Sequence, residues 1–193
     1  PIPYAAPAST TPTISLDIAL RNVASLKLVK ARKEGKSIPN TWVVDKDGLP
    51  TTDPSHYPEE GAVQPMAAHK GYGLAVMVEL MTGALSGGGM SMLGDIVSWL
   101  FEIEEPNNVC HTFIAVDIEK FVGKDAFVER TDAMAQALRN APKAKGSDRI
   151  YTPGEMEWNN HQKAQDGLNL PPNVVDSLEK LGSEIGLSIN WIE

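Results

Sequence analysis

Cysteine is nearly absent from the 193-residue sequence, with Cys110 as its single example. A lone cysteine cannot form an intramolecular disulfide, so the sequence favours a reducing compartment, and we predict the cytoplasm. The four histidines are far apart and form no His-Glu-x-x-His pair. With no cysteine cluster either, we expect no metal site.

Basic residues are scarce relative to acidic ones, at 17 Lys and Arg against 25 Asp and Glu, which gives a formal charge of -8. This is the wrong sign for a protein that binds nucleic acid or an anionic membrane surface. Long apolar runs are also missing, because the longest weakly charged stretch, residues 71–94, contains Glu79 and is broken by glycines. We therefore expect a small-molecule partner, no nucleic acid and no membrane.

The composition that remains is that of a globular protein, with 42% hydrophobic and 22% charged residues. At this length the chain can bury roughly 70% of the surface that it exposes when unfolded. We predict one domain over residues 1–193.

The first half of the sequence predicts a strand, a helix and a hairpin. Residues 13–18 form a buried strand that carries Asp17, and a helix with an apolar face at Leu20, Val23, Ala24, Leu28 and Ala31 follows it. Asp47-Gly48 then predicts a tight turn between strands. Four prolines between Pro50 and Pro65 predict a long loop without a regular element.

The second half predicts further helices and strands. We expect a central helix at 71–85 that is covered on all sides, a buried strand at 109–117 containing His111, and an extended piece at 149–152. Helices are expected at 125–139 (face Phe127, Thr131, Met134, Leu138), 155–165 and 173–185 (inner face Val175, Leu178, Leu181). Alternating strands and helices predict α/β packing, with helices on both faces of a mixed sheet.

Familiar catalytic motifs do not fit the sequence. It has no Gly-x-Ser-x-Gly elbow, and Gly35-Lys36-Ser37 lacks the upstream glycine of a phosphate-binding loop. Gly71-Tyr72-Gly73 opens a helix after Lys70, which indicates either an anion site or tight helix packing. A Rossmann site is disfavoured because Val76 stands where a third small residue is required.

Several residues have two interpretations. Asp17 either orients a ligand or caps the following helix. The carboxylate of Glu155 either binds a ligand or merely benefits from a helix dipole, which is worth about 0.3–1 kcal/mol. The basic run from Lys27 to Lys36 is either a solvated helix face or a site for an anion such as a 2′-phosphate.

Taken together, several segments resemble the malate/L-lactate dehydrogenase family that lacks a Rossmann fold. They are IPYAAP (2–7), LDIA (16–19), ARKEGKSIP (31–39), WVVDKDG (42–48), PTTDP (50–54), HKGYGL (69–74), LSG (85–87) and PGE (153–155). The resemblance implies a dimeric enzyme that uses NAD or NADP to interconvert 2-oxo and 2-hydroxy acids. It also implies a three-layer, non-Rossmann α/β fold, in which helices flank a mixed sheet.

The resemblance further implies which residues bind the cofactor. These are Thr13, Ile14, Ser15, Leu16, Asp17, Ile18, Ala19, His69, Lys70, Gly154, Glu155 and Met156. The family often has Met where this chain has Ile18, a departure next to Asp17.

Members of the family are nearly twice as long as this chain. The resemblance places the general-acid histidine and the arginines that clamp the substrate carboxylate in an upstream half, so we expect the natural protein to extend beyond Pro1. General-acid catalysis is worth about 10²–10⁴-fold in rate, so this chain alone should bind cofactor better than it turns over substrate. The alternative is a non-catalytic nucleotide- or anion-binding module on the same scaffold.

Overall fold

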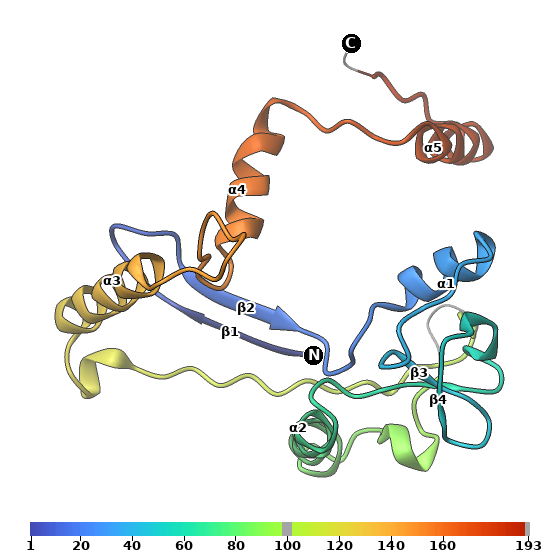
Figure 1. Cartoon of the computed structure of the whole chain (residues 1–193), viewed down its shortest axis with the longest axis horizontal. Helices are drawn as coiled ribbons and strands as arrows, with labels where there is room; N and C mark the ends of the chain where they lie inside the picture. Colours follow the sequence, from blue (N-terminus) through green and yellow to red (C-terminus); the bar gives the residue numbers. More distant parts are fainter. Residues whose placement is uncertain (98–101, 192–193) are drawn as a thin grey trace. The chain divides into compact units, whose positions relative to one another are not determined.

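A computed structural model describes residues 1–97 and 102–191 as an α/β arrangement of helices and two small sheets (Figure 1). The strands are β1 (Ile2–Ala6), β2 (Ile14–Ile18), β3 (Val43–Val44), β4 (Pro50–Thr51) and β5 (Ala62–Val63). The α-helices are α1 (Ser25–Lys33), α2 (His69–Glu79), α3 (Lys124–Asn140), α4 (Glu155–Lys163) and α5 (Pro172–Glu184). Across these two ranges, none of the helices is long and apolar enough to cross a lipid bilayer.

The chain divides into two compact units. Unit 1 comprises residues 1–4 and 16–121, and unit 2 comprises residues 5–15 and 122–193. The division passes through β1 and β2, which pair with each other in a two-stranded sheet. Whether residues 1–193 fold as a single domain stays a prediction.

The predicted hairpin is confirmed. Strand β3 pairs antiparallel with β4, with Val43 opposite Thr51, and β5 lies on the other side of β3. The carboxylate of Asp45 accepts hydrogen bonds from the amides of Asp47 and Leu49 at 2.9 and 3.0 Å, which closes the turn. Gly48 has the positive φ of 77° that favours glycine there.

The proline-rich stretch contains more regular structure than its composition predicts. It contains β4, a short 3-10 helix (Pro54–His56) and β5, so the expectation that it has no regular element is wrong. Pro50 is tolerated because β4 is an edge strand, where a missing N–H costs no ladder hydrogen bond.

The core of unit 1 lies under α1. Val23, Leu28, Ile38 and Val43 are buried and in contact with one another. The helix begins at Ser25, later than its apolar pattern predicts. The reason is that backbone groups before it bond elsewhere: the amide of Asn22 donates to the carbonyl of Gln64 at 2.9 Å.

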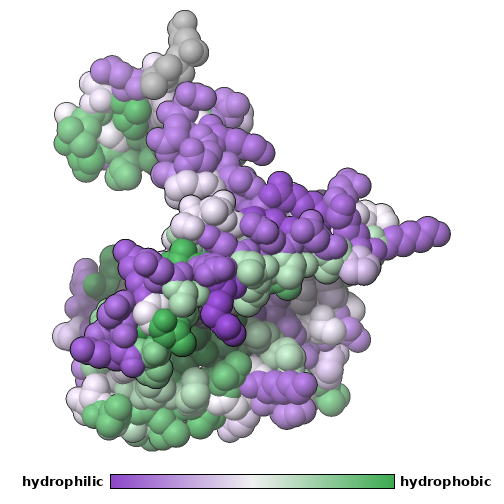
Figure 2. Space-filling model, turned by 90° about the vertical axis from the view of Figure 1, so that its left-hand side faces the viewer, coloured by the Kyte–Doolittle hydropathy of each residue, from purple (hydrophilic) through white to green (hydrophobic). Residues whose placement is uncertain are grey.

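The predicted helix at 71–85 corresponds to α2 followed by one turn of π-helix (Leu80–Ala84). The expectation that it is covered all round is wrong, because Tyr72 is 63% exposed and Leu80 is 55% exposed. Figure 2 shows hydrophobic residues, in green, on the surface of the molecule. An apolar pattern indicates which side chains are stabilised by burial. Within the described residues, Tyr72 and Leu80 nevertheless remain exposed to solvent.

The buried strand predicted at 109–117 is wrong. These residues form no strand, and both His111 and Phe113 are exposed. The extended piece predicted at 149–152 likewise forms no strand. A β-strand is stable only when a neighbouring strand accepts its hydrogen bonds, and a single sequence does not reveal that neighbour.

The three helices predicted in the second half are confirmed as α3, α4 and α5. Two of their predicted faces are correct only in part. In α3, Thr131 is buried as predicted, together with Asp132 and Ala135, whereas Met134 is 50% and Leu138 is 41% exposed. In α5, Leu181 is about half exposed. The physical reason in α3 is that polar contacts, described below, determine which face turns inward.

Candidate functional site

The residues predicted to bind a cofactor fall into two groups, and each group lies in one unit. Unit 2 holds residues 13–15 and 154–156, whereas unit 1 holds residues 16–19, His69 and Lys70.

In unit 2 the structure brings Ser15 together with the turn before α4. The amide of Ser15 donates a hydrogen bond to the carbonyl of Pro153 at 3.1 Å. Gly154 has a φ of 84°, and a Cβ at this position would lie 2.2 Å from the Oγ of Ser15. Only glycine combines this backbone conformation with this close approach. Ile14 is buried beside Ser15, while Thr13 and Met156 are exposed.

Glu155, the first residue of α4, is only 2% exposed. Its Oε2 accepts hydrogen bonds from Nε of Arg139 at 3.1 Å and from the amide and hydroxyl of Thr152 at 3.1 and 2.9 Å. Arg139 also reaches Oε2 through Nη2 at 3.0 Å, and Oε1 pairs with Nη2 of Arg149. Sequence reasoning anticipated an acid near a helix start but missed both arginines.

The Glu155 carboxylate is held in its ionised form. Burial acts to raise the pKa of this group, but the amide and hydroxyl of Thr152 together with Arg139 lower the pKa by more. A buried carboxylate is stable only when it is paired and hydrogen-bonded, which is the arrangement found here. The dipole of α4 is therefore a minor part of what stabilises this charge.

In unit 1 the predicted capping role of Asp17 is wrong. Asp17 is exposed on β2, whereas α1 begins eight residues later after Ala24, with no side-chain cap. Within the described ranges its carboxylate has no hydrogen-bond partner. The ligand-orienting interpretation of Asp17 is the one that stays open.

His69 and Lys70 open α2 and are exposed. Directly before them, Ala67 and Ala68 adopt φ values of 49° and 52°, which non-glycine residues rarely do. Such conformations cost on the order of 1–3 kcal/mol each and cluster at functional sites. The amide of Met66 bonds to the carbonyl of Leu20 at 3.0 Å, so the chain just beyond β2 adjoins the segment that leads into His69.

Gly71, the third residue of α2, lies close to the turn that precedes the helix. A Cβ on Gly71 would lie 2.1 Å from the carbonyl oxygen of Met66, and the Gly71 amide donates to that same oxygen at 3.0 Å. The Lys70 amide likewise donates to the carbonyl of Ala67. Gly71 therefore serves tight packing, and neither amide is free to bind an anion.

Three cations of the basic run from Lys27 to Lys36 pair with nearby acids. Arg32 pairs with Glu59 at 3.2 Å, and Lys36 and Lys30 pair with Glu34 at 2.7 and 3.8 Å. These side chains are solvent-exposed, which favours the interpretation as a solvated helix face.

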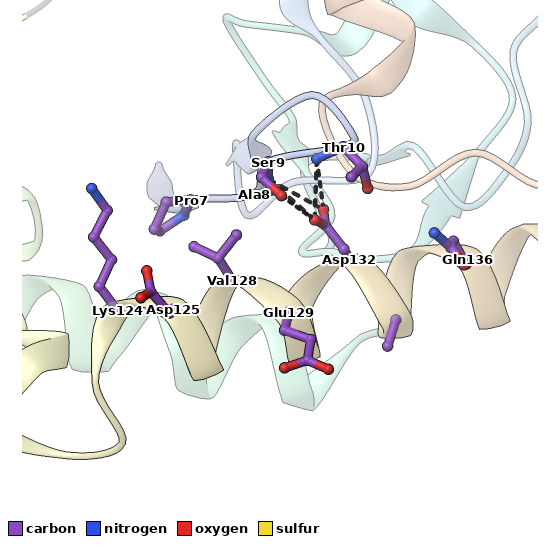
Figure 3. Close-up of a pocket in the computed structure, with 11 residues that line it drawn as sticks. Pro7, Ala8, Ser9, Thr10, Lys124, Asp125, Val128, Glu129, Asp132 and Gln136 are labelled. Atoms are coloured by element: carbon purple, nitrogen blue, oxygen red, sulfur yellow. Dashed lines mark hydrogen bonds between the residues drawn. The ribbon is translucent and has the colours of Figure 1, made fainter.

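A second buried acid, Asp132, escaped sequence analysis. Its carboxylate accepts a hydrogen bond from the hydroxyl of Ser9 at 2.6 Å and from the amides of Ser9 and Thr10 (Figure 3). The Ser9 hydroxyl, with the amides of both residues, lowers the pKa of this carboxyl, although burial acts against them. A groove of about 840 Å³ lies between residues 7–10 and α3.

One signal could have found Asp132. It stands four residues after Val128 and three before Ala135, so it shares a helix face with two apolar residues. A charged residue beside apolar neighbours indicates a buried partner, and the Ser-Thr-Thr run at 9–11 is rich in the donors that a carboxylate requires.

Comparison with protein families finds a match to the malate/L-lactate dehydrogenase family over residues 1–179. L-sulfolactate dehydrogenase of Methanocaldococcus jannaschii is 36% identical over 180 residues, which are 93% of this chain and 51% of that protein. A (2R)-3-sulfolactate dehydrogenase (NADP(+)) of Chromohalobacter salexigens is 35% identical, over 92% of this chain and 50% of its own length. Ureidoglycolate dehydrogenase (NAD(+)) of Escherichia coli is 28% identical over the same shares.

Comparison with solved structures also finds dehydrogenases. The sulfolactate dehydrogenase structure from M. jannaschii superposes with a TM-score of 0.80 at 33% identity, covering 95% of this chain and 51% of that one. Malate dehydrogenase from Entamoeba histolytica gives a TM-score of 0.82 at 26% identity, over 98% and 56%. The chain therefore spans about half the length of the proteins that it matches.

Proposed function

The chain belongs to the malate/L-lactate dehydrogenase family, and from this premise we propose that it supplies most of the cofactor site of an NAD(P)-dependent dehydrogenase. The reaction would interconvert a 2-oxo acid and a 2-hydroxy acid. The observation that carries this proposal is the family match over residues 1–179, supported by relatives named as hydroxy-acid dehydrogenases.

The described residues fit a nicotinamide dinucleotide, which carries a negative diphosphate and two sugars. Lys70 is an exposed cation, and Arg139 and Arg149 place two positive charges against the single negative charge of Glu155. The exposed carboxylate of Asp17 is able to accept a hydrogen bond from a sugar hydroxyl. We propose that Thr13–Ala19, His69, Lys70 and Gly154–Met156 form the cofactor site, through direct contact or by positioning residues that make it.

Each part of the chain has a distinct task in this proposal. The bound nicotinamide supplies or accepts a hydride. Lys70 neutralises phosphate charge, and Gly154 allows the backbone to approach the ligand more closely than a side chain would permit. The three-layer non-Rossmann arrangement, the homodimer, the cytoplasmic location and the choice between NAD and NADP stay predictions, as does the placement of the general acid outside this chain.

Lys70→Ala tests the cofactor site. We expect NADH or NADPH, titrated by its fluorescence, to bind at least several-fold more weakly, because a charge-assisted contact contributes about 1.5–3 kcal/mol. Lys46→Ala in the β3–β4 turn removes another exposed lysine and should leave binding unchanged. Equal affinities for wild type and Lys70→Ala would remove Lys70 from the site.

A non-catalytic binding module on the same scaffold is the second candidate, because the chain spans about half of its relatives. Turnover distinguishes the two. We expect the full-length protein to oxidise NADH or NADPH with at least one member of a panel of simple 2-oxo acids. Binding of the dinucleotide without turnover on any member would favour the module.

A further inference from the structure

The carboxylate of Glu155 has little capacity left for a ligand. Oε2 already receives two donors from Arg139 and two from Thr152, and Oε1 receives Arg149. Each carboxylate oxygen has about two lone pairs, so Oε2 is fully occupied. With the residue only 2% exposed, a sugar hydroxyl or water has almost no access to what remains.

The same contacts fix the shape of the turn before α4. Thr152 donates to the Glu155 carboxylate through both its amide and its hydroxyl, and the Glu155 amide donates back to the Thr152 carbonyl at 3.0 Å. Pro153 and Gly154 lie between these two anchored residues. Their positions against Ser15, through the Pro153 carbonyl and the Gly154 Cα, therefore depend on the Glu155 carboxylate.

We propose that Glu155 is a positioning residue, which holds the Pro153–Gly154 turn against Ser15 through Arg139, Arg149 and Thr152 and does not itself contact the nicotinamide cofactor. This inference rests on the proposed function and refines the role of one residue in it. The backbone of the Pro153–Gly154 turn and Ser15 form the surface that contacts the cofactor. The Glu155 carboxylate supports this turn without touching the cofactor.

The charges explain why a glutamate is needed at this position. Two guanidinium groups, from α3 and from the segment before α4, converge on one carboxylate. A neutral amide in its place would direct an NH₂ group at donors and leave both arginines without a counter-ion. The three segments that meet at Glu155 would then separate, and the turn would lose its fixed position.

Three variants test the inference in the whole protein, with NADH and NADPH as the probes. Glu155→Gln removes the charge, Arg139→Gln removes a partner on α3, and Thr152→Val removes one hydrogen bond at nearly constant shape. Arg130→Gln, which alters an exposed arginine on the same helix, is the matched control. Thr152→Val keeps the test usable if the charge variants fail to fold.

We expect cofactor affinity to fall about tenfold in Glu155→Gln and Arg139→Gln, about threefold in Thr152→Val, and not at all in Arg130→Gln. At saturating cofactor, kcat should recover to within about twofold, because Glu155 touches no reacting atom. Hydrogen exchange at the Ser15 amide should accelerate in the first three variants only, since this amide reports the contact with Pro153.

Wild-type affinity in Arg139→Gln together with a loss in Glu155→Gln would overturn the inference, because it would show that the carboxylate binds cofactor directly. Unchanged exchange at Ser15 would overturn it as well. If wild-type protein bound neither NADH nor NADPH, the proposed function would fail instead, and the Ser15 exchange measurement would still report whether Glu155 holds the turn.

Discussion

Ala68 occupies a backbone conformation that suits glycine, with φ at 52° immediately before His69. We predict that Ala68→Gly raises the free energy of unfolding by on the order of 1 kcal/mol, because released strain of about 1–3 kcal/mol exceeds the entropic cost of glycine, about 0.5–1 kcal/mol. Thermal or denaturant unfolding measures the change.

Ala137→Gly is the control for this prediction. Ala137 is exposed in the interior of α3, where glycine costs about 1 kcal/mol, so this variant should shift stability in the opposite direction. Destabilisation by both substitutions to the same extent would show that Ala68 is not strained.

At Gly154, a single added methyl group should lower both the stability of the protein and its affinity for the cofactor. Alanine at a φ of 84° is strained by about 1–2 kcal/mol, and its Cβ would also overlap with Ser15. We predict that Gly154→Ala lowers the free energy of unfolding by more than about 1 kcal/mol and weakens NAD(P)H binding. Gly146→Ala, at a similar φ but with open space around it, should show the strain alone.

The connection between α3 and the β1–β2 loop depends on an ionised acid, as does the turn before α4. Asp132 and Glu155 both have pKa values lowered by folding, from ordinary values of 3.8 and 4.5. A lowered pKa gives stability that is complete above the unfolded-state value and is lost as pH falls through the folded-state value. We predict that the free energy of unfolding is level above about pH 5 and declines below about pH 4.

Asp132→Asn should make this decline shallower, whereas Glu129→Gln, an exposed acid on the same helix, should leave its slope unchanged. Denaturant unfolding across the acid range provides the measurement. An Asp132→Asn curve parallel to that of wild type would contradict the assignment.

Helix α1 is held to unit 1 by one side chain above all. Leu28 is 1% exposed and contacts the other buried residues of the core. We predict that Leu28→Ala costs about 2–5 kcal/mol of stability, because it removes buried methyl groups and leaves a cavity. Leu26→Ala, at a position 77% exposed on the same helix, should change stability by less than about 0.5 kcal/mol.

At the scale of elements, local signals were sufficient for the helices and the hairpin. The apolar spacing that predicted α3 and α5, although not their buried faces, and the Asp-Gly turn each depend on neighbours a few residues away. The strand predicted at 109–117 failed because pairing requires a partner that is distant in sequence. The predicted buried face of α3 was wrong in part, because Asp132 bonds to Ser9 and Arg139 bonds to Glu155. Neither partner lies within α3, so the helix's own pattern does not reveal it.

At the scale of the whole molecule, large apolar side chains remain on the surface, among them Phe113 at 92% and Ile114 at 74% exposed. Exposed apolar groups of this kind often mark association surfaces. We predict a homodimer, as the family resemblance implies, and sedimentation of the full-length protein at low concentration measures its mass. A monomer at every concentration would contradict the prediction.

The sequence by itself determined the family of this protein, because motifs such as HKGYGL and PGE are local strings that need no coordinates. It also identified the residues proposed for the cofactor. Only the tertiary structure decided how some of them are held: Gly154 against Ser15, Glu155 between two arginines, and Gly71 against Met66. The contact of Gly154 with Ser15 joins residues 139 positions apart, and Arg139 reaches Glu155 across 16 positions, so only folding brings these residues together.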